Sequence, residues 1–275
     1  MPALRSTALT LALLSLLGCG GGEPESPGSS SEPTSQSTSQ STSTPPAPAV
    51  QPAAAPRAAS GAAIEYPAVV TKFPDAMSEE ARQLIFNTKG VSLQSSRAKG
   101  TWSALSRSLE QAQPQIEALL RVTEMKDCTF AAVTIDKDAR KLPPDLLELF
   151  RGMRNSSGIL AADAARCYLA GDTSGATRRA AAIASMLRHL AESGLPKAAD
   201  LALAPFGQLE QIVPPMAAGV NGTTLTESDR ATLLSALNML NAADPCGMAG
   251  GAAGDALAAK QAAKLAAMKA ALGAV

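Results

Sequence analysis

The chain has few aromatic residues, a single histidine and no excess of either charge. Aromatic residues make up 3% of its 275 residues, Trp102 is the only tryptophan, and 24 Lys and Arg balance 24 Asp and Glu. One histidine excludes a metal site built on two histidines, including the H-E-x-x-H pattern. No basic patch interleaved with aromatics occurs, which argues against a nucleic-acid partner. The core must therefore consist of Leu, Ala, Ile, Val and Met, which suit closely packed helices.

The sequence also lacks a recognisable catalytic or cofactor site. Neither a G-x-S-x-G nor a Walker pattern is present. The run Asp136-Lys137-Asp138 begins like a calcium loop, but the required downstream Gly and Glu are missing. His189 falls opposite the apolar stripe of its helix, so we predict a solvated position, the alternative being a catalytic base. We therefore predict no catalytic, metal or cofactor-binding residue and no cofactor. We favour a protein that is not an enzyme and leave an unrecognised site open.

The amino-terminal residues follow the pattern of a secretory signal. Arg5 precedes an apolar run that ends in Leu16-Leu17-Gly18-Cys19. This run is too short to span a bilayer. The four residues resemble a bacterial lipobox, which implies that residues 1–18 are a lipoprotein signal peptide and that Cys19 is lipidated. The membrane is then a partner through the lipid anchor, and Gly20, by resemblance to enterobacterial sorting, favours the outer membrane over the inner. The alternative is an ordinary signal peptide cut near Gly18.

Residues 19–62 are predicted to form a disordered linker rich in Ser, Thr and Pro. The tract contains almost no large apolar residue, so burial cannot offset the entropy lost on ordering. A random-coil chain of this length reaches on the order of 40 Å. We interpret it as a spacer that holds a folded domain away from the membrane.

Residues 63–275 are predicted to form one all-α domain, and a helical hairpin is its clearest element. Apolar or small residues alternate spacings of four and three from Pro144 to Gly171, and a second such stripe follows. The first stripe consists of Leu146, Phe150, Met153, Ser157, Leu160, Ala164 and Cys167, and the second of Ala176, Ala180, Ile183, Leu187 and Leu190. Gly171 suits a carboxy-terminal cap, and the short Gly171-Asp172-Thr173-Ser174 turn requires antiparallel packing.

Further helices are predicted on both sides of this hairpin. They cover residues 78–87, 101–113, 114–125 (two separate helices, or one kinked by Pro114), 197–213 and 255–272. Residues 129–135 are predicted to be extended. Thr226 and Asp229 have the spacing of a capping box, which predicts a helix start there. The terminal helix is predicted to dock onto the domain, and its alternative is a membrane-surface helix. Short linkers favour an antiparallel helical-hairpin array, either tetratricopeptide-like or an irregular bundle.

Two resemblances concern the hairpin. Ala164, the Gly171-Asp172 turn and Ala176 resemble the small-residue positions and turn of a tetratricopeptide hairpin, although Asp163 stands where that repeat has a large apolar residue. The stretch from Cys128 to Leu190 resembles an uncharacterised family of bacterial helical proteins. That resemblance implies a helical hairpin and supplies no activity.

Three cysteines remain if Cys19 is lipidated. Cys167 lies on the apolar stripe and is predicted to be a small buried residue. Cys128 and Cys246 lie in loop-like segments and are predicted to form a disulfide in an oxidising compartment. The alternative pairs Cys128 with Cys167 and leaves Cys246 free.

Anchor, linker and helical domain together suggest a function in the cell envelope. Our leading hypothesis is a membrane-anchored extracytoplasmic interaction module that binds another envelope protein. One alternative is a small-ligand carrier, or an enzyme with an unrecognised site, which an apolar cavity with convergent polar groups would favour. Another is a structural spacer whose length matters more than its surface.

Overall fold

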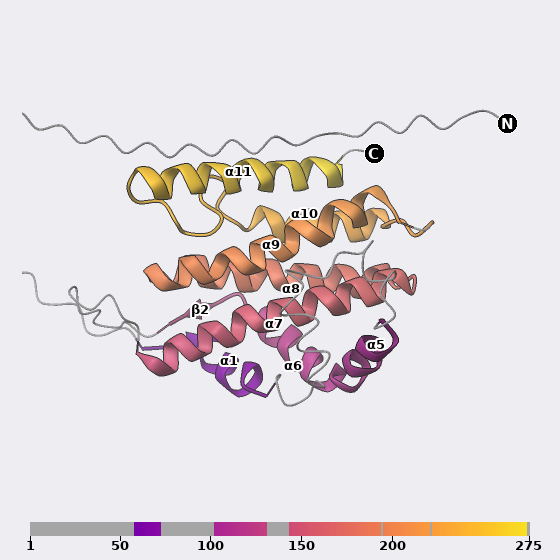
Figure 1. Cartoon of the computed structure of the whole chain (residues 1–275), viewed down its shortest axis with the longest axis horizontal. Coiled ribbons are helices and arrows are strands. Elements are labelled where there is room, and N and C mark those ends of the chain that lie inside the picture. The colour runs from indigo at the N-terminus through magenta and orange to yellow at the C-terminus, as the bar shows by residue number, and fades with distance from the viewer. Residues whose placement is uncertain (1–57, 73–101, 131–142, 194, 221, 274–275) are drawn as a thin grey trace, which may run out of the picture. The chain divides into compact units, whose positions relative to one another are not determined.

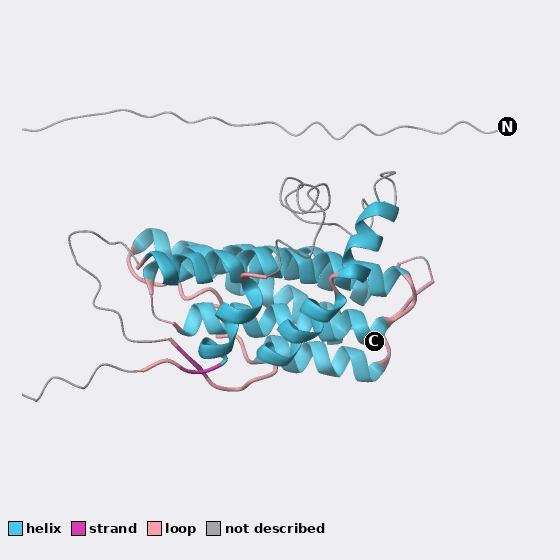
Figure 2. Cartoon of the chain, turned by 90° about the horizontal axis from the view of Figure 1, so that it is seen from below, coloured by secondary structure: helices cyan, strands magenta, loops and turns pink. Residues whose placement is uncertain are grey.

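The computed structural model describes residues 58–72, 102–130, 143–193, 195–220 and 222–273, and these form an all-α domain (Figures 1 and 2). Its helices are α1 (Ala62–Val70), α5 (Trp102–Gln111), α6 (Gln113–Thr123), α7 (Pro144–Leu169), α8 (Thr173–Glu192), α9 (Pro196–Ala218), α10 (Glu227–Asn238) and α11 (Ala252–Gly273). The predicted all-α fold class is confirmed. The predicted signal peptide, Cys19, most of the linker, the helix over 78–87 and the run Asp136-Lys137-Asp138 lie outside the described residues.

The predicted hairpin is present as α7 and α8. Apart from half-buried Leu146, every residue of the two predicted stripes is buried. The amide of Asp172 donates to the carbonyl of Cys167 at 2.9 Å and that of Gly171 to Tyr168 at 3.1 Å, which is the Schellman pattern of helix termination. Gly171 has φ 86°, a left-handed conformation that glycine adopts without strain. The Asp172 carboxylate then caps α8 by accepting from the amide of Gly175 at 2.8 Å.

Helices α7, α8 and α9 pack against one another and form the centre of the domain. Figure 1 shows α1, α5 and α6 on one side of this centre and α10 and α11 on the other. On the first side, α6 contacts α8 while α1 and α5 contact α7; on the second, α10 contacts α8 and α11 contacts α9. The helices range from 9 to 26 residues, and this inequality favours an irregular bundle over a regular repeat.

The elements outside the hairpin refine the prediction. Thr226 and Asp229 form the predicted capping box. Of the two alternatives for residues 101–125, the structure has two separate helices, α5 and α6, and not one kinked helix. The terminal helix α11 docks on α9 and α10, burying Leu265, Met268 and Leu272, as predicted. No helix among the described residues is long and apolar enough to cross a membrane.

Two short strands form an antiparallel ribbon: one lies directly before α1 in the chain and the other lies shortly after α6. It pairs β1 (Ser60–Gly61) with β2 (Cys128–Thr129). Of the residues assigned to the linker, Ser60 and Gly61 therefore belong to the ribbon and Ala62 begins α1. Gly61 has φ 61°, and a Cβ there would lie 2.0 Å from the carbonyl oxygen of Asp127, so only glycine allows this close approach. Of the predicted extended segment 129–135, only Thr129 lies in a described strand.

A buried ionic cluster joins α6, α7 and α8. The side chain of Asp163 is 0% exposed and accepts from Arg166 Nε at 2.7 Å, from Gln113 Nε2 at 3.0 Å and from Arg179 Nε. Arg179 also donates from Nη2 to Gln113 Oε1 at 2.8 Å and from Nη1 to the carbonyl of Gly175 at 3.1 Å. Each oxygen of the buried carboxylate thus has a charged or amide donor. This cluster gives the buried Asp163 a structural role, because it joins three helices.

We expect Asp163→Ala to lower the free energy of unfolding by about 3–5 kcal/mol, because it leaves Arg179 buried without its carboxylate. Arg178→Ala is the control, since Arg178 pairs with Glu117 and Glu124 at the surface, where such pairs contribute about 1 kcal/mol or less. Denaturant unfolding followed by circular dichroism measures both. The double variant Asp163→Leu with Arg179→Met should regain much of the loss, because it removes both charges. Equal, small losses for Asp163→Ala and Arg178→Ala would contradict this account.

Candidate functional site: a pocket between α6, α8 and α10

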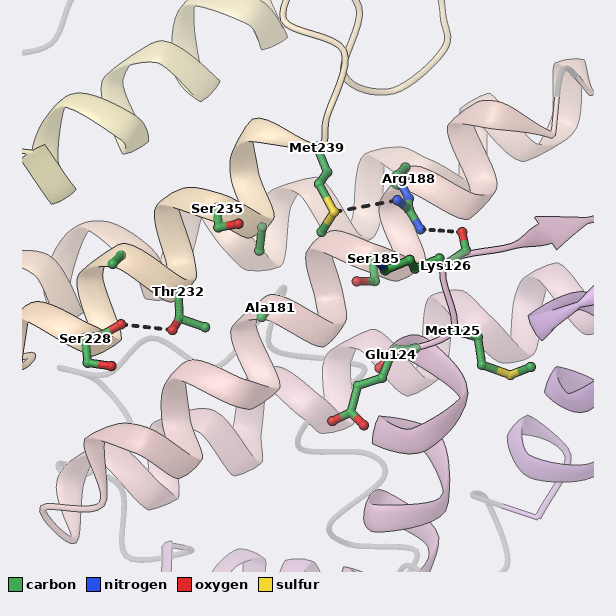
Figure 3. Close-up of a pocket in the computed structure, with 13 residues that line it drawn as sticks. Glu124, Met125, Lys126, Ala181, Ser185, Arg188, Ser228, Thr232, Ser235 and Met239 are labelled. Atoms are coloured by element: carbon green, nitrogen blue, oxygen red, sulfur yellow. Dashed lines mark hydrogen bonds between the residues drawn. The ribbon is translucent and has the colours of Figure 1, made fainter.

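A pocket of about 560 Å³ lies where the end of α6 and the face of α10 meet across α8 (Figure 3). The residues after and at the end of α6 form one wall, α8 forms the floor, and α10 forms the other wall. Its lining consists of Thr123, Glu124, Met125, Lys126, Ala181, Ser185, Arg188, Ser228, Ala231, Thr232, Ser235, Ala236 and Met239.

Short side chains create the space. Ala181, Ser185 and Arg188 follow one another at spacings of four and three, so they share one face of α8. Ser228, Thr232, Ser235 and Met239 share one face of α10 in the same way. Leu233 and Leu237 of α10 are buried in the core, whereas the small side chains beside them line the pocket and are too short to fill it. The pocket was not predicted from the sequence, because small polar residues beside a leucine stripe are also typical of an ordinary solvent-facing surface.

Exposed methionines stand at the pocket. Among the described residues, the large hydrophobic side chains that are exposed are Ile64, Met125 and Met239. Met125 and Met239, which are 37% and 47% exposed, both line the pocket, one on each wall. Single exposed hydrophobic residues are normal, but two at one concave site are typical of a contact surface.

Arg188 is the charged side chain of the pocket floor, and its side chain is 16% exposed. Nη2 donates to the carbonyl of Lys126 at 3.0 Å, which fixes the guanidinium against the wall formed by residues 124–126 (Figure 3). Nη1 lies 3.6 Å from Met239 Sδ. Nε is buried and has no hydrogen-bond partner among the described residues; its nearest carboxylate is the exposed Glu192, at 3.9 Å.

His189 adjoins this floor but is buried, which corrects the predicted solvated position. Its residue is 1% exposed, Nδ1 lies 2.8 Å from the Tyr66 hydroxyl and Nε2 lies 3.1 Å from Arg188 Nη2. The helical wheel of α8 alone misplaced it because the wheel omits Tyr66 of α1, which packs edge-on against the imidazole. Desolvation and the neighbouring Arg188 charge lower the pKa of His189 to about 4. Both nitrogens of this neutral imidazole contact other side chains, so the ring helps to hold α1 against α8. This arrangement gives no support to the alternative that His189 is a catalytic base.

The cysteines lie in three separate surroundings. Cys128, Cys167 and Cys246 are free thiols in the described part of the chain, so neither the predicted Cys128–Cys246 disulfide nor the alternative Cys128–Cys167 pairing is formed in this structure. Cys167 is buried as predicted, and Cys246 lies in a turn between α10 and α11, as predicted, but is fully buried there. Burial raises the pKa of Cys128 and Cys246 to about 12 and that of Cys167 to about 11. All three therefore remain protonated at neutral pH and are poor nucleophiles.

The described residues contain no group of three or more His, Cys, Asp or Glu that could hold a metal ion. The pocket presents hydroxyl groups, two exposed methionines and one arginine whose Nε has no hydrogen-bond partner among the described residues. Comparison of the chain with protein-family models, with curated proteins and with solved structures finds no match.

The buried imidazole predicts a specific pH dependence of stability. Because the pKa of His189 is about 4 in the folded chain and about 6.5 when unfolded, the unfolded chain binds the additional proton between these values. Stability should therefore fall as the pH drops from 6.5 to 4, by roughly 3 kcal/mol from this group. Since His189 is the only histidine, its NMR titration gives the pKa without ambiguity.

The control for this prediction is His189→Gln, which removes the titrating ring. We expect the variant to be less stable than the wild type at pH 7 and the difference between them to shrink as the pH falls to 4. An imidazole that titrates near pH 6.5 in the folded protein would contradict the buried position.

Proposed function

We propose that the protein is an extracytoplasmic lipoprotein, anchored through Cys19 to a bacterial membrane, and that this is the outer rather than the inner membrane. Its helical domain binds another envelope protein, and the pocket between α8 and α10 receives a segment of that partner. The observation that supports the binding role is the meeting of small side chains and two exposed methionines at one concave site. The anchor rests on the resemblance of residues 16–19 to a lipobox, and the spacer role of the linker rests on its composition.

The form of the pocket favours a protein segment over a small molecule. Four residues of α10 and Met239 directly after it are exposed: Ser228, Ala231, Thr232, Ser235 and Met239. Pockets for small molecules bury 70–90% or more of the ligand surface, which these open walls do not provide. Short side chains instead let a backbone approach closely, and flanking methionines adapt to the apolar side chains of a helix or extended segment.

A small-ligand carrier is the second candidate because of one observation. The volume of about 560 Å³ falls within the range typical of ligand sites. A carrier should retain its ligand on purification, so native mass spectrometry of the protein isolated from membranes separates the two functions.

The anchor is tested by Cys19→Ser. The full-length wild type should incorporate labelled palmitate and remain with the membrane fraction, because several acyl chains at roughly 0.8 kcal/mol per buried CH₂ give stable attachment. The variant should carry no label. An unlabelled wild type whose mature amino terminus follows Gly18 would instead indicate an ordinary signal peptide.

The binding role is tested with a photo-reactive amino acid in place of Thr232 in the full-length protein in cells. We expect one envelope protein to be crosslinked, and Ser235→Trp to reduce that product about tenfold or more, since the indole occupies the pocket. Asn238→Trp is the matched control, because Asn238 is exposed on α10 but outside the lining. Loss of the product in both variants, or in neither, would contradict binding at this pocket.

A further inference from the structure

The bonding of Arg188 indicates what the pocket binds. A guanidinium has five N–H donors and no acceptor, so a mostly buried arginine normally meets several oxygen atoms. In this pocket, the carbonyl of Lys126 is the one oxygen that accepts a hydrogen bond from Arg188 among the described residues. Nη1 has a thioether sulfur, a weak acceptor, and Nε has no hydrogen-bond partner. The Nε and Nη1 donors of this cation therefore have no oxygen acceptor within hydrogen-bond distance among the described residues.

The group that covers these donors is easily moved. Met239 follows directly after α10, its residue is 47% exposed, and an unbranched methionine side chain rotates freely. Rotation of Met239 would open Nη1 to the pocket, while the bond from Nη2 to Lys126 keeps the guanidinium in place.

The other charges at the pocket favour a negative ligand. Glu124 is paired with Arg178 at 2.9 Å, and Glu192 is 60% exposed and 3.9 Å from Arg188 Nε. Lys126 lines the same wall, is exposed and forms no ion pair with the described residues. His189, which contacts Arg188 from behind, is neutral at pH 7 and contributes no charge of its own. An incoming carboxylate would meet Arg188 and Lys126, whereas an incoming cation would meet two like charges.

We infer, resting on the proposed function, that the partner segment carries an Asp or Glu whose carboxylate replaces Met239 Sδ on Arg188, flanked by apolar side chains that contact Met125 and Met239. Arginine and carboxylate form strong charge-assisted hydrogen bonds, and the partly buried floor limits screening by water. The displaced methionine then covers the apolar part of the segment.

Carbodiimide coupling in the full-length protein tests this inference. Arg188→Lys introduces an amine at the floor, and the reagent joins that amine to a carboxylate in direct contact with it. Glu192→Gln is added to remove the neighbouring carboxylate of this chain. We expect an amide between position 188 and an Asp or Glu of the same protein that is photo-crosslinked from position 232. Asn238→Lys in the same Glu192→Gln background is the control and should give no such product.

The outcomes separate the inference from the proposed function. A partner crosslinked from position 232 without an amide at position 188 overturns the carboxylate contact and leaves the binding role standing. Absence of both products overturns the binding role as well.

A second measurement leaves this chain unchanged. In the identified partner, replacement of the coupled Asp by Asn, or Glu by Gln, should weaken binding to the wild-type protein about tenfold or more, as expected for the loss of a charge-assisted contact. An unchanged dissociation constant overturns the inference even if Arg188→Lys disturbs folding.

Discussion

The ion pair between Asp163 and Arg179 is the interaction on which the rest of the domain depends. A carboxylate with no exposed surface is tolerated only when both of its oxygens accept hydrogen bonds, and here Arg166, Arg179 and Gln113 donate to them from three helices. An apolar residue at the same position would allow the helices to slide past one another, because hydrophobic contacts have no direction. The ion pair instead requires one alignment of α6, α7 and α8.

That alignment determines which faces of α8 remain for other partners. Arg179 points toward α6 and α7, and the face of α8 that carries Arg188 therefore lies next to the end of α6 and to α10. Thr173 at the start of α8 donates to Asp229 of the α10 capping box at 2.8 Å, so the same carboxylate that caps α10 also fixes where α10 lies. The position of the pocket therefore depends on two contacts of α8: the buried ion pair of Arg179 with Asp163, and the hydrogen bond from Thr173 to Asp229, which also caps α10.

Features that depend on neighbouring residues in the chain were predicted correctly from the sequence. The hairpin, its Gly171 cap and the Thr226–Asp229 capping box each involve groups a few residues apart, so local spacing is enough to identify them. Features that depend on distant groups were not. The burial of His189 requires Tyr66, which lies 123 positions away, and the partners of Asp163 come from α6 and α8. A helical wheel contains no information about either.

The contrast between Arg179 and Arg188 shows why the pocket, rather than the ionic cluster, is the functional candidate. The two arginines lie nine positions apart on α8, about two and a half turns, and so face opposite sides. Each of the three guanidinium nitrogens of Arg179 donates to an oxygen atom, those of Asp163, Gly175 and Gln113. Arg188 gives one nitrogen to an oxygen and holds the others against a thioether and an exposed carboxylate. A buried charge that the fold leaves incompletely bonded costs stability, and its retention in a concave site is explained if binding, rather than folding, completes its contacts.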